Sequence, residues 1–230
     1  CCHGWGTNSG DILPATWYLA QQGFNLFYLD FRGCGASPRR GRCSLGYYET
    51  EDLVAALRYL KTRRSAQAQW LGVYGLSMGG VAALGLGARE EGREIQAMVV
   101  EASYLSFRRV LERYISFYFH LPKLLAWPFL AALYYRTRPA DHEAASPLAM
   151  APRSRVPRIF FLYGENDRMV PPSDAQEIRR LLPAASRSEL WICPDAAHAQ
   201  CFNSHPEFYR EHLGNFFRNA SEKNFVKREA

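Results

Sequence analysis

The stretch Gly75-Leu76-Ser77-Met78-Gly79 lies between an apolar run at 70–74 and a run of small apolar residues at 80–88. The first run is typical of a buried strand, and the second is typical of a helix packed closely on a sheet. A G-x-S-x-G sequence in this context indicates a serine on a sharp strand-to-helix turn. Its glycines let strand and helix approach closely, while the serine adopts a strained backbone conformation. The pattern predicts that Ser77 is a nucleophile near the positive end of the helix dipole.

Strand-like and helix-like segments alternate along the rest of the chain. The expected strands cover residues 24–30, 70–75, 97–102, 158–164 and 189–192, and the expected helices cover 49–61, 78–90, 173–182 and 206–218. This alternation favours an α/β fold with a mostly parallel sheet and helices on both faces. In such sheets the reacting groups collect beyond the carboxyl ends of the strands.

One segment, residues 103–152, departs from the alternation. Residues 114–135 within it are nearly all apolar or aromatic and long enough to raise the question of a membrane span. A lysine, a histidine and two prolines interrupt the run, and it lies between two strands of one sheet. We therefore expect a helical cap at 103–152 on a core formed by 1–102 and 153–230. Exposed aromatic side chains would let this cap contact a lipid surface.

Composition narrows the functional classes. A chain of 230 residues with 48% hydrophobic content can bury one domain core without disulfide or metal staples. Its six cysteines have neither zinc spacing nor the density of a secreted scaffold, so we expect free thiols, no metal site and a reducing compartment. The formal charge of +6 is spread over separate stretches without a recognition motif. Solvated faces with some attraction to anionic surfaces are therefore favoured over nucleic-acid binding.

An activated serine needs a general base and a group that orients it. His198 lies in a loop after a late strand, where the base is expected. His205 is the nearest rival, but it precedes Pro206 and the last helix, and a helix N-cap role suits it better. We therefore predict that His198 is the base.

The orienting carboxylate is expected at the end of the preceding strand. Asp167 is favoured, because a carboxylate placed past the turn can swing towards the base, whereas Glu165 is expected to support the loop. Glu101, at the end of the strand before the cap, is a second choice. Asp195 is interpreted as a turn former.

A tetrahedral oxyanion needs two N–H donors. We expect one from the backbone of Met78, directly after the nucleophile, and one from Trp5 in the early loop His3-Gly4-Trp5-Gly6. The Trp5 ring would also form a wall of the substrate-binding acyl pocket, and His3 is interpreted as structural.

These motifs, with the turn Asp30-Phe31-Arg32-Gly33-Cys34-Gly35-Ala36-Ser37, resemble the α/β-hydrolase superfamily. Within it, that turn and Ser77-Met78-Gly79-Gly80 resemble the serine aminopeptidase and monoacylglycerol-lipase-like branch. The resemblance implies an eight-stranded sheet whose third strand runs between the fourth and fifth. Strands one and two and nearly all of three have no counterpart here, and the chain opens on Cys1 without Met, so we expect a truncated N-terminus.

The sequence therefore predicts a serine hydrolase of carboxylic esters or thioesters. It would act on a small acyl substrate through an acyl-enzyme intermediate and without a cofactor, and the aromatic cap favours an apolar acyl group. An aminopeptidase-like amidase with the same residues is the alternative among enzymes, and a non-catalytic ligand-binding protein on this fold is the alternative outside them. A cytoplasmic or membrane-associated location is favoured.

Overall fold

The computed structural model describes residues 1–38 and 42–225. Within this part of the chain, one sheet contains the strands β1 (Gly72–Leu76), β2 (Ala97–Glu101), β3 (Arg158–Gly164) and β4 (Arg187–Cys193). The α-helices are α1 (Ser9–Thr16), α2 (Tyr47–Arg63), α3 (Met78–Gly87), α4 (Phe107–Tyr118), α5 (Ala126–Arg136), α6 (Pro147–Met150), α7 (Pro172–Leu181), α8 (Cys201–Ser204) and α9 (Pro206–Phe225). Short 3-10 helices are η1 (Trp17–Gln22), η2 (Ser65–Gln67), η3 (Glu90–Glu94), η4 (Lys123–Leu125) and η5 (Ala151–Arg153).

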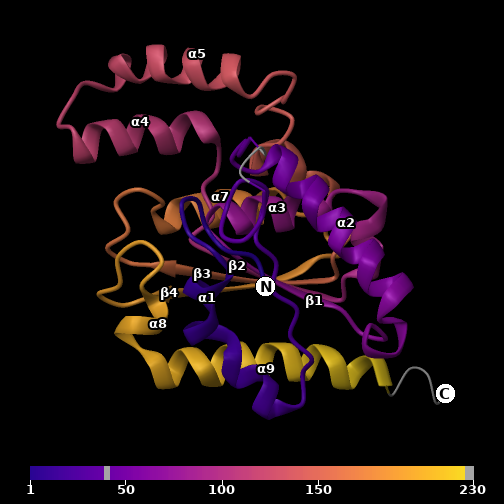
Figure 1. The fold of residues 1–230 in the computed structure, drawn as a ribbon. Helices are drawn as coiled ribbons and strands as arrows, with labels where there is room; N and C mark the ends of the chain where they lie inside the picture. Colours follow the sequence, from indigo (N-terminus) through magenta and orange to yellow (C-terminus); the bar gives the residue numbers. More distant parts are fainter. Residues whose placement is uncertain (39–41, 226–230) are drawn as a thin grey trace.

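The four strands are parallel and follow the order β1-β2-β3-β4 (Figure 1). All four therefore end at one edge of the sheet, and the loops that follow them meet there. The predicted α/β architecture with a mostly parallel sheet is confirmed.

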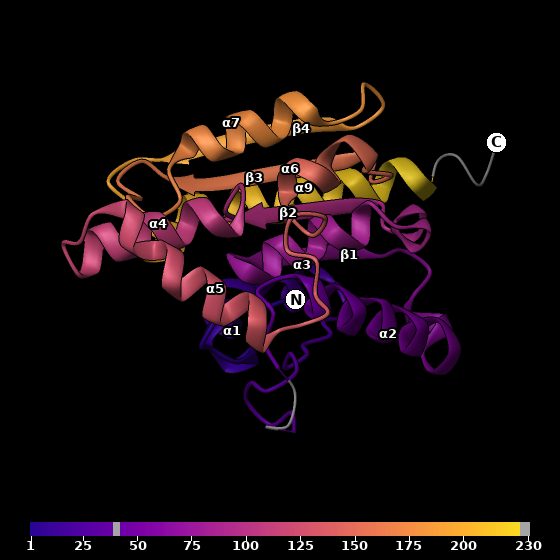
Figure 2. The same cartoon turned by 90° about the horizontal axis from the view of Figure 1, so that it is seen from above.

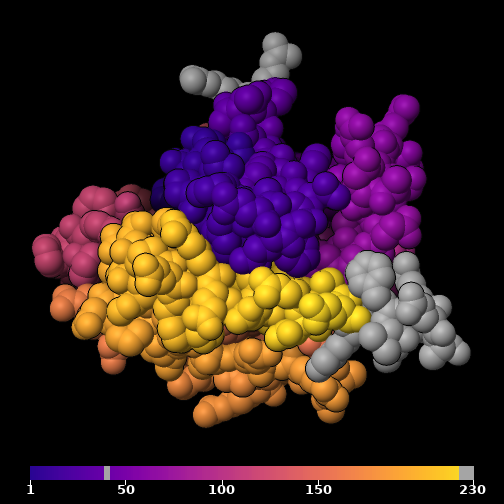
Figure 3. All heavy atoms as spheres, turned by 90° about the horizontal axis from the view of Figure 1, so that it is seen from below, coloured from indigo at the N-terminus to yellow at the C-terminus, as the bar shows by residue number. Residues whose placement is uncertain are grey.

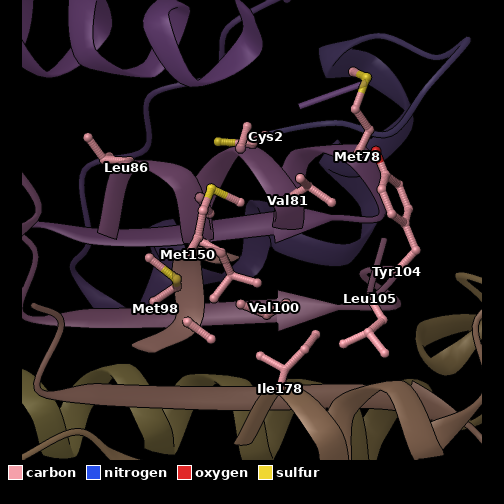
Figure 4. Close-up of a cluster of buried hydrophobic side chains, with 14 of the residues drawn as sticks. Cys2, Met78, Val81, Leu86, Met98, Val100, Tyr104, Leu105, Met150 and Ile178 are labelled. Carbon is pink, nitrogen blue, oxygen red and sulfur yellow. The ribbon is translucent and has the colours of Figure 1, made fainter. Parts of the chain in front are cut away.

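Helices cover both faces of this sheet, with α2, α3 and α7 on one side and α1 and α9 on the other (Figure 1). Side chains alternate between the faces along each strand. Met98 and Val100 of β2 join the core around α3, where Val81 lies (Figure 4), while Val99 joins the core under α9. From below, α9 and the N-terminal segment cover the second face together (Figure 3).

Cys2 extends the sheet beyond β1. It forms parallel bridges to both Leu29 and Gly75. Its N–H donates to the Tyr74 carbonyl at 2.9 Å, and its carbonyl accepts from the Leu76 N–H at 3.0 Å. The segment at Cys2 therefore runs between Leu29 and β1, which is the strand order that the family resemblance implies.

The prediction of a regular strand at residues 24–30 is wrong. Only Leu29 forms a bridge, and the chain's terminal ammonium group donates to the Phe27 carbonyl at 2.8 Å. A regular strand is stabilised by a ladder of hydrogen bonds to a neighbour, and the contacts of this segment with Cys1 and Cys2 form a single bridge. A mainly apolar cavity of about 300 Å³ separates residues 24–29 from β1.

The segment predicted as a helical cap contains α4, η4, α5 and α6. Helices α4 and α5 pack side by side above the sheet in Figure 1, and the view from above places α4 over the ends of the strands (Figure 2). Ile115 of α4 and Leu130 of α5 are buried in the core around α3, and α6 packs against α3 with Met150 in the same core. No helix within residues 1–38 and 42–225 combines the length and apolar composition that a bilayer span requires.

Candidate active site

Ser77 occupies the predicted turn between β1 and α3. Its backbone has φ 51° and ψ −111°, a conformation that non-glycine residues rarely adopt. The N–H of Ser77 donates to the Glu101 carbonyl at 2.7 Å, and this bond holds the turn against the end of β2. The strained strand–turn–helix geometry is confirmed, and strain of this kind is typical of functional residues.

The two glycines of the motif permit this geometry. A Cβ on Gly75 would collide with the backbone of Gly79. A Cβ on Gly79 would lie 2.5 Å from the Cys2 carbonyl oxygen and 2.7 Å from that of His3. Gly79 thus allows α3 to approach both β1 and the segment at Cys2.

A chain of hydrogen bonds starts at the Ser77 hydroxyl. Its Oγ lies 3.2 Å from Nε2 of His198, and Nδ1 of His198 lies 2.7 Å from Oδ2 of Asp167. An ionised carboxylate only accepts, so Nδ1 carries the proton and Nε2 is free to accept the serine hydrogen. The three side chains that the sequence predicts to act together are therefore in contact.

Asp167 is held firmly in this position. Its side chain is fully buried, and its Oδ1 accepts from the N–H groups of Met169 at 3.0 Å and Val170 at 2.7 Å. These two donors were not predicted from the sequence. The signal was available, because aspartate side chains commonly accept from backbone N–H groups two or three residues later.

The loops that carry Asp167 and His198 are joined to each other. Asn166 donates its N–H to the Ala196 carbonyl at 2.9 Å, and a Cβ on Gly164 would collide with that carbonyl. The Asp195 N–H donates to Glu165 Oε2 at 3.3 Å. Glu165 therefore supports the loop as predicted, and Asp195, with φ 56°, occupies the expected turn.

Glu101, the second choice for the orienting acid, lies in a different environment. Its buried Oε2 accepts from the hydroxyl groups of Tyr74 at 2.8 Å and Tyr209 at 2.6 Å. Burial raises the pKa of the Glu101 carboxyl above its usual value, although the two tyrosine hydrogen bonds act in the opposite direction. The carboxylate that His198 contacts is Asp167.

His205, the rival base, is directed elsewhere. Its Nε2 donates to the Pro194 carbonyl at 3.0 Å, while its own carbonyl accepts the Tyr209 N–H at 2.9 Å. The second bond is that of an N-cap residue, since the N-cap carbonyl accepts the first hydrogen bond within a helix. The predicted N-cap role at α9 is confirmed.

The loop that was expected to supply an oxyanion donor lies against the nucleophile. A Cβ on Gly4 would be 3.6 Å from Cβ of Ser77. His3 is buried in this loop: its Nε2 accepts from the Phe31 N–H at 3.0 Å, so its Nδ1 carries the proton and donates to the Gly4 carbonyl at 2.7 Å. This agrees with the structural role predicted for His3. The Trp5 ring is largely exposed.

Met78 follows Ser77 directly at the start of α3. It is the first residue of α3, and the first N–H groups of a helix have no acceptor within it. Such groups carry the positive end of the helix dipole. The site thus combines a serine, an imidazole, a carboxylate and a helix N-terminus, which together suit nucleophilic attack on a carbonyl group.

The cysteines do not contribute to this arrangement. All six are free thiols, as expected. Burial raises the pKa of Cys2, Cys193 and Cys201, which keeps these sulfur atoms in the unreactive thiol form. Among residues 1–38 and 42–225, no group of three or more His, Cys, Asp or Glu side chains is placed to hold a metal ion.

Comparison with known proteins identifies the family. Residues 1–154 match the family model described as serine aminopeptidase, S33. The chain belongs to this family. The matched region includes the Ser77 turn, and Asp167 and His198 lie beyond it.

Similar proteins of known sequence or structure are consistent with this fold. The uncharacterized protein YfhR of Escherichia coli O157:H7 is 25% identical over 222 residues, which span 95% of this chain and 69% of that protein. The Pyrococcus furiosus esterase Pf2001 has a TM-score of 0.77 at 23% identity, covering 95% of this chain and 81% of the esterase. The Paleococcus ferrophilus monoacylglycerol lipase has a TM-score of 0.63 at 20% identity, covering 95% and 93%. The fold is that of an α/β-hydrolase, and the family is one of hydrolases.

Proposed function

We propose that this protein is a serine hydrolase that cleaves carboxylic esters or thioesters through an acyl-enzyme. The observation that carries the proposal is the continuous hydrogen-bonded chain from Ser77 through His198 to Asp167, which begins at a strained turn. A hydroxyl is a weak nucleophile until an adjacent base removes its proton. Nε2 of His198 is the nitrogen placed to do so.

The first half of the proposed reaction is acylation of Ser77. Ser77 Oγ attacks the substrate carbonyl carbon as its proton moves to His198 Nε2. Asp167 holds the ring by its Nδ1–H and stabilises the imidazolium that forms. The tetrahedral intermediate then collapses, the Nε2 proton goes to the leaving alcohol or thiol, and the acyl group remains on Ser77.

The oxyanion of this intermediate is assigned to the N–H groups of Met78 and Trp5. The support is that Met78 begins α3 and that the loop containing Trp5 lies against Ser77. A donor of this kind stabilises the transition state by roughly 3 to 4 kcal/mol. Water attacks the acyl-enzyme in the second half of the reaction, with His198 acting again as the base. Neither half requires a cofactor or a metal ion.

The bond cleaved is assigned to the ester and thioester class. The structurally similar Pf2001 is an esterase, and another similar protein is a monoacylglycerol lipase. The exposed aromatic side chains of α4 and α5 favour an apolar acyl group. We propose the Trp5 ring, which is largely exposed, as one wall of the acyl pocket. The family description favours an aminopeptidase-like amidase as the second candidate.

A substrate panel tests the assignment. The purified protein is assayed with p-nitrophenyl esters of short and long acyl chains, acyl-CoA thioesters and aminoacyl amides, and we expect the highest kcat/KM for one of the first two classes. Ser77→Ala should lower kcat by about four orders of magnitude or more.

The matched control is Ser103→Ala. This substitution also removes a buried serine hydroxyl, and that hydroxyl has no hydrogen-bond partner within the described part of the chain. We expect it to retain activity. Hydrolysis confined to aminoacyl amides would support the amidase, and equal activity in Ser77→Ala and the unsubstituted protein would contradict both enzymatic candidates.

A further inference from the structure

Large apolar side chains are exposed together at one end of the α4–α5 pair. Every residue from Phe117 to Leu125 is exposed. The surface continues along α5, and its largest members are Phe117, Phe119, Leu124, Trp127, Phe129 and Tyr135. We call residues 117–135 the cap face. A contiguous exposed apolar surface of this kind marks an interaction site, in contrast to isolated exposed residues.

Helix α5 is apolar on both sides. Its inner side buries Ala126 and Leu130 in the core cluster. Its outer side would be polar in a helix that faces water. Instead, Trp127 is 66% exposed and Tyr135 is 71% exposed, and Leu124 in the preceding turn is 75% exposed. The sequence from 124 to 135 contains no charged residue.

Cations predominate around the cap face, although the carboxylate of Glu143 lies beside the Tyr134 hydroxyl. Residues 113–140 contain no aspartate or glutamate, whereas Lys123, Arg136 and Arg138 are exposed there. The Arg138 guanidinium lies 5.3 Å from the centre of the Tyr135 ring, and that of Arg168 lies 5.8 Å from the centre of the Phe117 ring. Aromatic rings bordered by cations are typical of surfaces that enter the interface of an anionic bilayer.

We propose that the cap face docks this protein on the surface of an anionic lipid bilayer, with its aromatic side chains in the headgroup region and its cations against the lipid phosphates. A second copy of the chain is the other partner that could cover an apolar face. Pairing of two cap faces would bring the cations of one copy against those of the other, and residues 113–140 supply no carboxylate to neutralise them, Glu143 beside Tyr134 being outside that range. A bilayer that carries negative charge satisfies both the apolar and the cationic groups.

Docking of this face would also orient the candidate active site. Arg113 of α4 donates to Asp174 and to the Met169 carbonyl, in the loop whose N–H groups hold Asp167. The cap face is therefore anchored next to the Asp167 loop, so the lipid surface would lie beside the route to Ser77. Binding to lipid is independent of the proposed reaction and can be measured without substrate.

Vesicle flotation tests the proposal. The protein is mixed with phosphatidylcholine vesicles, with and without phosphatidylglycerol, and the bound fraction is measured at low salt and at ~1 M salt, where the Debye length is about 3 Å. We expect binding to the anionic vesicles that weakens as salt is added. Trp127→Ser should reduce the affinity by about tenfold or more, because a large aromatic side chain no longer leaves water. Trp17→Ser is the matched control, since Trp17 is 44% exposed and lies on η1, outside the cap face.

Charge-reversal variants provide a second test of binding to anionic lipid. The pair Lys123→Glu and Arg136→Glu should weaken anionic binding by at least about tenfold at low salt. The matched pair Arg63→Glu and Arg64→Glu, exposed at the end of α2, should change it much less. Sedimentation velocity without lipid measures self-association. The proposal would be overturned if the protein did not bind anionic vesicles, or if the control variants lost as much vesicle binding as the cap-face variants. A dimer in the absence of lipid that Trp127→Ser dissociates would also overturn it.

Discussion

Arg113 and Asp174 form a two-point ion pair that joins α4 to α7. Nη1 of Arg113 lies 2.7 Å from Oδ2 of Asp174, and Nη2 lies 2.9 Å from Oδ1. Asp174 is buried, and the pair raises the pKa of the Arg113 guanidinium. The same Nη1 donates to the Met169 carbonyl at 3.2 Å. This ion pair therefore attaches the cap helix α4 to the loop that positions Asp167.

Removal of one partner of this pair should be costly. Arg113→Leu leaves the Asp174 carboxylate buried, with the Leu105 N–H as its remaining donor at 3.2 Å. We expect the free energy of unfolding to fall by about 2 to 4 kcal/mol, towards the low end because the arginine is partly exposed. Urea denaturation measures this change in the free energy of unfolding. Arg109→Leu breaks the exposed pair with Glu177 and should cost less than about 1 kcal/mol, so equal losses would argue against the buried pair.

Two glycines close to Ser77 should respond differently to alanine. In Gly79→Ala, the new methyl group would overlap the carbonyl oxygens of Cys2 and His3. Backbone atoms cannot move aside as a flexible side chain can, so we expect a loss of several kcal/mol or a failure to fold, as for other overpacked sites (~1–3 kcal/mol or more). Gly4→Ala makes only ordinary contacts, the nearest at 3.6 Å. Similar thermal midpoints for the two variants would contradict the close approach of α3.

Glu101 should make stability depend on pH. Burial raises the pKa of its carboxyl in the folded protein. In the unfolded state the pKa of a glutamate side chain is about 4.3. Below that pH both states are protonated and the stabilising contribution is fully present. It is lost as pH rises towards and through the higher folded pKa, because the folded state then has to accept a buried charge.

Glu101→Gln removes this titration and keeps an amide oxygen for the tyrosine hydroxyls. The unfolding free energy of the variant minus that of the unsubstituted protein should therefore increase with pH above about 4.3. Urea unfolding over a pH series measures the difference. A difference that does not change with pH would show that burial leaves the proton affinity of Glu101 unchanged.

Local sequence signals were sufficient for much of the site. The strand-to-helix turn at Ser77 could be predicted because its glycines, its serine and the flanking apolar runs lie within 20 residues of one another. The positions of Asp167 and His198 followed from one rule, that groups placed after parallel strands meet at one edge of the sheet. The helical nature of 103–152 followed from its composition.

Features set by distant contacts could not be predicted in this way. The segment 24–30 has the composition of a strand, yet strand formation depends on a ladder with a neighbour, and this segment forms only the bridge between Leu29 and Cys2. Glu101 is separated by 108 residues from Tyr209, which binds its carboxylate, and Arg113 by 61 from Asp174. Which side of α5 faces outward also depends on packing, since both sides are apolar.

Covalent labelling of Ser77 tests the central claim most directly. The protein is treated with a fluorophosphonate probe, which reacts with activated serines, and the modified peptide is identified by mass spectrometry. We predict one adduct, on Ser77, with no adduct in His198→Ala and labelling slowed by about three to four orders of magnitude in Asp167→Asn. Glu101→Gln should label at nearly the original rate. An unlabelled protein that is correctly folded, or an adduct on any other residue, would contradict the assignment of Ser77 as the nucleophile.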